Sequence, residues 1–140
     1  MKEYNLILVY DEKEENILMC KRAKEPYKGK YNLVGGKINP GEDKMDAAYR
    51  ELGEETGIQR DDINLTHMLN LQYPMIGTAL EVYAGKLNKD VKLIKEVNEL
   101  YWINKDEDFA DKDKYAGEGN IAYMVEQAKL YKDEIFKNNK

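Results

Sequence analysis

The sequence predicts an α/β (α+β) fold in which a mixed sheet lies between helices, within a single domain spanning residues 1–140. Short runs rich in Val, Ile, Leu and Tyr are separated by turn residues, which is typical of strands. Two longer segments carry apolar residues at helical spacing, and the order along the chain is strands, helix, strands, helix. A chain of 140 residues is also long enough to bury a core.

The expected strands begin near the N-terminus. Residues 4–10 and 16–22 form two apolar runs on either side of a polar turn, and we expect them to pair as a hairpin. Because both runs are almost continuously apolar, we expect the sheet to be covered on both faces. Further strands are expected over residues 31–34, 65–73, 78–87 and 99–103.

Two helices are expected to cover this sheet. The first follows Pro40-Gly41 and ends at Gly57, a residue suited to the left-handed conformation at a helix C-terminus. One side of it carries the residues that would face the core: Met45, Ala48, Tyr49, Leu52 and Thr56. The second is an amphipathic helix running from Ile121 through Ile135, followed by a frayed tail.

Charge and composition limit the partners and the location that we expect for the protein. The formal net charge of −5 argues against a nucleic-acid polymer or an anionic membrane as the main partner, and an acidic protein that handles phosphates needs a cation to do so. Cys20 is the single cysteine and lies in an apolar run, so we expect a buried, inert thiol. With neither a signal peptide nor a membrane span in the pattern, the expected location is cytoplasmic.

Three carboxylates near the end of the first helix conflict with local helix physics. Glu51, Glu54 and Glu55 fall within an arc of roughly 100° on the helix surface. Like charges at this spacing repel one another, and they lie at the negative end of the helix dipole. A bound divalent cation would reverse both penalties, and hard oxygen ligands favour Mg²⁺ or Mn²⁺. The alternative is a solvated charged face with an Arg50–Glu54 ion pair.

The residues around these glutamates follow a recognisable pattern. Gly36 is followed after five residues by Glu42 and, after seven more, by the run Arg50-Glu51-Leu52-x-Glu54-Glu55-x-Gly57-Ile58. This spacing resembles the Nudix box of MutT-type pyrophosphohydrolases, with every fixed position filled. The resemblance implies a Nudix-type α/β/α sandwich. It also implies hydrolysis of a nucleoside diphosphate linked to another group, by water activated at Mg²⁺ or Mn²⁺.

The resemblance also assigns roles by position. It implies that Glu51, Glu54 and Glu55 hold the metal, that Arg50 orients them, and that the Gly35 carbonyl and Glu42 are further metal or loop contacts. The general base varies across this family. Glu54 is the first candidate for it, Glu99 the second and Glu96 the third, although each also fits an ordinary surface residue.

Substrate contacts are less specific in the sequence. Lys21 and Arg22, at the end of the second expected strand, are candidates for phosphate oxygens. Tyr31, Tyr73, Tyr83 and Phe109 are candidates to stack on a base, although residues of this kind more often simply pack in the core. His67, the only histidine, is expected to be structural.

Three functions remain open from the sequence. The first is hydrolysis of a nucleoside triphosphate, oxidised forms included, and the second is hydrolysis of ADP-ribose or a nucleotide-sugar. The third is a non-catalytic Nudix-fold module that binds a nucleotide; it is disfavoured because a binder has no need of a crowded carboxylate cluster. In each case the partner is a small-molecule nucleotide, and the resemblance allows a homodimer.

Overall fold

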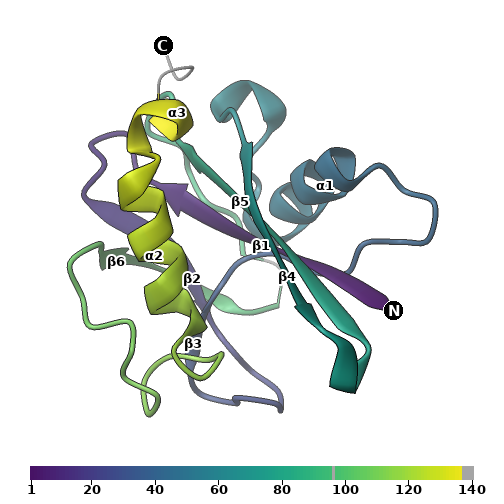
Figure 1. Cartoon of the computed structure of the whole chain (residues 1–140). Coiled ribbons are helices and arrows are strands. Elements are labelled where there is room, and N and C mark those ends of the chain that lie inside the picture. Colours follow the sequence, from purple (N-terminus) through teal and green to yellow (C-terminus); the bar gives the residue numbers. More distant parts are fainter. Residues whose placement is uncertain (96, 137–140) are drawn as a thin grey trace.

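The computed structural model describes residues 1–95 and 97–136, and within them six strands form one mixed sheet with helices on both faces (Figure 1). The predicted α/β class is therefore confirmed. The strands are β1 (Lys2–Tyr10), β2 (Asn16–Lys21), β3 (Tyr31–Leu33), β4 (Thr66–Tyr73), β5 (Thr78–Lys86) and β6 (Glu99–Asn104). The helices are α1 (Lys44–Thr56), α2 (Asn120–Leu130) and α3 (Lys132–Phe136), with short 3₁₀ turns η1 (Arg60–Asp62) and η2 (Pro74–Ile76).

The sheet is organised around β1. Its strand order is β3-β2-β1-β5-β4, with β6 paired to β2, and β1 runs parallel to β5 along its whole length. The predicted hairpin of β1 and β2 is paired only at its closing end, through Tyr10 and Ile17. The segment after β3 bridges to the remaining edge of β1, where Val34 lies opposite Ile7 and Lys37 opposite Tyr4. This segment therefore occupies the edge that a longer hairpin would use.

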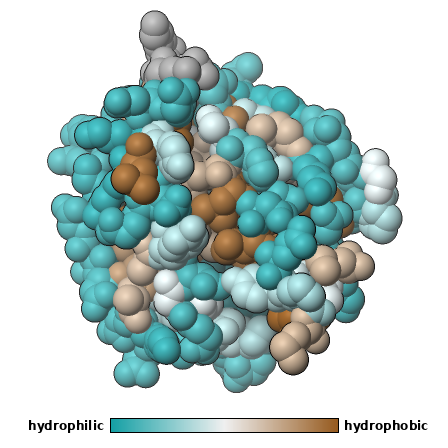
Figure 2. Space-filling view, in the orientation of Figure 1, coloured by the Kyte–Doolittle hydropathy of each residue, from teal (hydrophilic) through white to brown (hydrophobic). Residues whose placement is uncertain are grey.

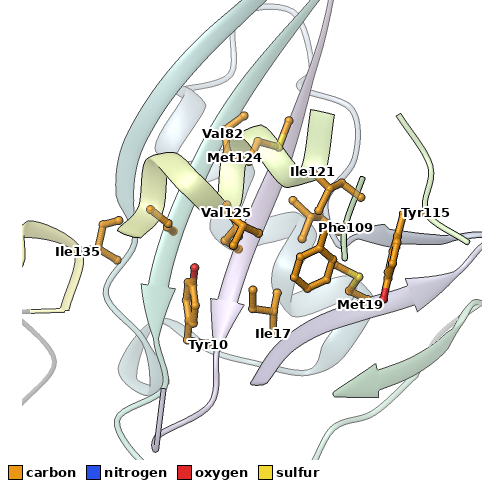
Figure 3. Close-up of a cluster of buried hydrophobic side chains, with 14 residues drawn as sticks. Tyr10, Ile17, Met19, Val82, Phe109, Tyr115, Ile121, Met124, Val125 and Ile135 are labelled. Atoms are coloured by element: carbon orange, nitrogen blue, oxygen red, sulfur yellow. The ribbon is translucent and has the colours of Figure 1, made fainter. Parts of the chain in front are cut away.

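Side chains of β1 alternate between two apolar layers. Leu8 and Tyr10 pack under α2 and α3, whereas Ile7 and Val9 pack under α1. Figure 3 shows the first layer, in which Ile121, Met124 and Val125 of α2 project onto the strands below. Burial on both faces, inferred from the near-continuous apolar runs, is thus confirmed.

Helix α1 covers the other face as the sequence predicts. Ala48, Leu52 and Thr56 are buried, and Met45 and Tyr49 pack partly buried beside them. This arrangement fixes the rotation of α1, and with it the direction in which the adjacent glutamates point.

The C-terminal helix differs from the prediction, because it is broken at Tyr131. Residue Tyr131 leaves helical geometry and its side chain is half exposed. The break lets α3 turn onto the sheet, where Ile135 is buried and the ring of Phe136 meets that of Tyr10 edge-on at 5.0 Å. Residues 137–140, predicted to be frayed, lie outside the described residues. None of the described helices is long and apolar enough to cross a membrane.

Candidate active site

The ends of α1 are fixed by local interactions. Asp43 is the N-cap, and its side chain accepts a hydrogen bond from the Asp46 amide at 3.0 Å. At the other end Gly57 adopts the left-handed conformation, with φ of 82°, as predicted for a helix terminator. Since Ala48 and Leu52 are buried against the sheet, the Glu51 and Glu55 side chains reach past the edge of the helix toward the loop after β3.

Arg50 joins the carboxylates of this region. Its guanidinium donates two hydrogen bonds to Glu42, at 2.7 and 2.9 Å, in a forked arrangement. The third nitrogen, Nη1, donates to Glu51 at 2.9 Å and to Glu54 at 3.0 Å. Nη2, one of the two nitrogens bonded to Glu42, also donates to the Lys37 carbonyl at 3.0 Å. One arginine therefore bridges three glutamates and the loop that follows β3.

The Gly35-Gly36 dipeptide of that loop lies against two of the glutamates. The Gly35 amide donates to Glu55 Oε1 at 3.1 Å. A Cβ atom on Gly36 would lie only 2.4 Å from Glu51 Oε2, so that only glycine allows this approach. Gly36 donates its own amide to the Asn5 side chain at 2.9 Å. Both amides of the dipeptide are thus already engaged within the protein.

Electrostatic effects at the site follow from burial and from Arg50. Burial raises the pKa of Glu51, although the hydrogen bond from Arg50 opposes this. The hydrogen bond from Arg50 lowers the pKa of Glu42, and the same contact raises the pKa of Arg50 itself. Glu51 is therefore a partly desolvated carboxylate. Arg50, whose positive charge is shared with Glu42 and Glu54, offsets only part of the cost of burying it.

A cavity of about 510 Å³ opens beside the dipeptide. Its walls are mostly apolar and aromatic, and include Tyr4, Tyr27, Tyr73, Leu80 and Met124. The polar residues that line it include Asn5, which is itself fully buried, and Arg22, Asn32, Glu55, Thr78, Asn98, Glu118 and Asn120. On the face of the molecule that carries α2, hydrophobic residues gather between that helix and the β4–β5 hairpin, surrounded by hydrophilic ones (Figure 2). The volume is suited to an organic ligand with apolar rings.

Comparison with known proteins bears directly on this arrangement. The family model described as "NUDIX domain" matches residues 4–117, which is most of the chain. The chain belongs to the Nudix family. The match confirms the family resemblance seen in the sequence. Hydrolases of this family generally use divalent metal ions.

Individual proteins are similar to this chain in sequence or in fold. An ADP-ribose pyrophosphatase of Methanocaldococcus jannaschii is 45% identical over 47 residues, 34% of this chain and 28% of the archaeal enzyme. The match thus spans less than a third of that relative's length. The Ap4A hydrolase of C. elegans, solved as a binary complex, superposes with a TM-score of 0.76 at 19% identity, covering 96% of this chain and 99% of the other. A MutT/nudix family protein of Enterococcus faecalis gives 0.74 at 18% identity, covering 94% and 62%.

The structure brings together most residues of the predicted Nudix site. Arg50 contacts Glu42, Glu51 and Glu54, while Glu55 and Gly35 meet each other and line the cavity. Arg22, a candidate for phosphate contact, also lines the cavity, and its Nε donates to the Pro26 carbonyl at 2.6 Å.

Other candidates lie elsewhere. Lys21 is exposed and sits above the ring of Tyr31, which in turn packs against Tyr101 and Tyr115, outside the cavity wall. Tyr83 is buried on the α1 face of the sheet, because odd-numbered residues of this part of β5 point to that face. Glu99 is exposed, forms an ion pair with Lys95 and does not line the cavity. Glu96 lies outside the described residues.

Sequence reasoning missed several residues at the site, and Tyr27 and Asn5 are two of them. Tyr27 lines the cavity from a loop in which its own φ is 65°, a conformation that nothing in the local sequence indicates. Asn5 contacts the glycine dipeptide from the middle of an apolar strand. A signal for Asn5 was present, since it is the one amide within the run YNLILVY.

The glutamates fit a hard divalent cation by chemistry. All the donors are oxygens, Glu51 is partly desolvated, and the absence of a Cβ on Gly36 lets the Glu51 carboxylate pack directly on the backbone. Across residues 1–95 and 97–136, however, no three acidic, His or Cys side chains already converge as a metal site. Arg50 holds Glu51 and Glu54, and the Gly35 amide holds Glu55. Binding a cation therefore requires these carboxylates to move closer to one another.

Proposed function

We propose that the protein is a Mg²⁺- or Mn²⁺-dependent pyrophosphohydrolase acting on a small nucleotide, in which a nucleoside diphosphate is linked to another group. One observation carries the proposal. Glu51 and Glu55 meet the Gly35-Gly36 dipeptide at the rim of an aromatic cavity large enough for a nucleoside. This arrangement supports a diphosphate lying over the glutamates while the nucleoside enters the cavity.

In this proposal Glu51, Glu54 and Glu55 hold the cation, with the Gly35 carbonyl and Glu42 as further contacts. When bound, the cation activates water, neutralises phosphate charge and holds the phosphates in line. Arg50 fixes the positions of these glutamates relative to one another through its hydrogen bonds to Glu42, Glu51 and Glu54.

Glu54 is the proposed general base. Its side chain is half exposed and so accessible to a water molecule, and Arg50 orients it from 3.0 Å. Glu99 is the weaker candidate, because it is paired with Lys95 and lies away from the cavity lining.

Contacts within the cavity support the placement of the nucleoside. Arg22 is the only lysine or arginine among the described residues that line it. A chain of phosphates would need more positive charge there, whereas apolar rings match the walls formed by Tyr27 and Tyr73. We propose that Arg22 meets the first phosphate and that Tyr27 or Tyr73 contacts the base.

Two substrate classes follow. Hydrolysis of a nucleoside triphosphate, oxidised forms included, remains the first, and the architecture shared with MutT-type proteins supports it. Hydrolysis of ADP-ribose or a nucleotide-sugar is the second, and the similarity to the archaeal ADP-ribose pyrophosphatase favours it specifically. A cytoplasmic location and a homodimer remain predictions.

A panel of nucleotides tests the proposal. The wild-type protein is assayed with Mg²⁺ on nucleoside triphosphates, an oxidised dGTP, ADP-ribose, a nucleotide-sugar and Ap4A, and compared with Glu54→Gln and Glu55→Gln. Both variants are expected to lose about 10²–10³-fold in kcat, the scale of removing a main electrostatic stabiliser. The matched control is Glu126→Gln, which makes the same change on the exposed face of α2.

The outcomes separate an enzyme from a binding module. If the wild type hydrolyses none of these compounds while binding one of them, the protein is the non-catalytic alternative. Full activity in both glutamine variants would remove these glutamates from the proposed mechanism.

A further inference from the structure

Asn5 is a polar residue in the middle of the central strand, and its side chain has no exposed surface. It lies on the α1 face of β1, as Ile7 and Val9 do. Burying an amide costs free energy unless its hydrogen bonds are replaced. The presence of asparagine here therefore calls for a specific contact.

That contact is with the glycine dipeptide, which Asn5 holds from two sides. Its backbone amide donates to the Gly36 carbonyl at 2.8 Å, and its Oδ1 accepts from the Gly36 amide at 2.9 Å. The Asn5 carbonyl packs so closely on Gly35 that a Cβ there would lie 2.2 Å away. Of these contacts, an apolar side chain would abolish only the bond to Oδ1.

The dipeptide in turn determines where two glutamates can lie. The Gly35 amide binds Glu55 Oε1, and the Glu51 carboxylate packs directly on Gly36. Gly36 is thus in contact with Asn5 and with Glu51. A change in the position of Gly36 would move the surface on which Glu51 rests.

We infer that Asn5 is a positioning residue that, by fixing the Gly35-Gly36 dipeptide, places Glu51 and Glu55 for cation binding. The inference rests on the proposed function, since it concerns the glutamates proposed to hold the cation. Asn5 itself acts through the dipeptide rather than on the cation or the substrate. Groups that hold metal ligands in this way commonly change metal affinity about 10–100-fold when removed.

The side-chain nitrogen of Asn5, Nδ2, supports the inference that Asn5 is a positioning residue. Its Nδ2 is buried and has no hydrogen-bond partner among the described residues. An unpaired buried donor destabilises a protein, so an apolar residue of similar size would suit the core at least as well. Stability alone therefore does not account for asparagine, whereas the bond to Gly36 does.

The test measures Mn²⁺ binding by isothermal titration calorimetry, together with the melting temperature of the metal-free protein. Asn5→Leu removes the acceptor for the Gly36 amide and is expected to weaken Mn²⁺ binding about tenfold or more. Asn5→Asp keeps an acceptor oxygen at the same position and is expected to recover most of the affinity. The matched control is Thr56→Val, which removes a buried hydroxyl bonded to Leu52 and Ile58 without touching the dipeptide.

Each outcome decides the question. Weaker Mn²⁺ binding in Asn5→Leu, with Thr56→Val binding as the wild type does, supports the inference. Unchanged binding in Asn5→Leu overturns it, as does an equal loss in both variants, which would reflect destabilisation alone. If Asn5→Leu does not fold, Asn5→Asp decides by itself, since an affinity far below that of the wild type would remove the role of the acceptor. Failure of the wild type to bind Mn²⁺ or hydrolyse any nucleotide would instead refute the proposed function.

Discussion

Replacing Gly36 by alanine tests the role of the Glu51 carboxylate with a single added methyl group. That group would lie 2.4 Å from Glu51 Oε2, 2.5 Å from its Cδ and 2.8 Å from its Oε1. Ordinary van der Waals contact begins at 3.4 Å, so the carboxylate must retreat by the difference, 1.0 Å. A displacement of about 1 Å at a reacting site can lower the rate about 10²-fold.

The cost in stability is smaller than the cost in activity. The obstacle is the end of a flexible side chain, which can rotate away, so we expect a loss of no more than about 1–2 kcal/mol on the scale of overpacked cores. The assay combines kcat for the best substrate of the panel with thermal unfolding in the absence of metal. A folded Gly36→Ala protein with wild-type kcat would show that the position of Glu51 does not matter for the reaction.

Gly53→Ala is the matched control for this change. Gly53 lies inside α1, two residues from Glu51, but a Cβ there would be 3.6 Å from the nearest atom, the Ile58 carbonyl oxygen. The substitution is expected to keep full activity and to stabilise the helix by about 1 kcal/mol.

Two further predictions concern metal and pH. Mg²⁺ at about 100 times its Kd is expected to add about 2.7 kcal/mol of stability by binding the folded state; the melting temperature would rise by several degrees, and no rise would contradict a metal site in the substrate-free protein. Glu81 is buried; burial alone would raise its pKa, but hydrogen bonds from Lys44 and His67 lower the pKa below its ordinary value of 4.5. The stabilisation that ionised Glu81 contributes is therefore complete above about pH 4.5 and is lost as the pH falls through the lowered folded-state pKa. Glu81→Gln should lower the free energy of unfolding by about 1–3 kcal/mol at pH 7 and flatten the acid limb of a curve of stability against pH. An unchanged acid limb would mean that Glu81 is not a source of this pH dependence.

The glutamate cluster could be predicted because its geometry is local. Residues 50–56 belong to one helix, and the apolar positions Ala48 and Leu52 fix its rotation without any knowledge of the rest of the chain. The same holds for the end of the helix, which Gly57 determines through its own conformation.

The cavity could not be predicted in the same way, because its walls come from segments far apart in the sequence. Tyr83 and Tyr73 are both strand aromatics, and only the pairing of β4 with β5 shows that Tyr83 faces α1 while Tyr73 reaches the cavity. The pairing of β1 with β5 could not be predicted either, since it joins residues separated by 76 positions, as in Lys2 and Thr78. Nothing in either strand alone encodes such a register.

The glutamates and much of the cavity wall come from different parts of the chain. The dipeptide, Asn5 and the glutamates all lie between residues 5 and 55, whereas much of the apolar wall comes from residues 73–80 and 117–124. Substitutions in the later segments can thus reshape what the protein accepts without disturbing the carboxylates. On this architecture, changes in residues 73–80 and 117–124 can alter which ligand fits the cavity while the glutamates of α1 stay in place.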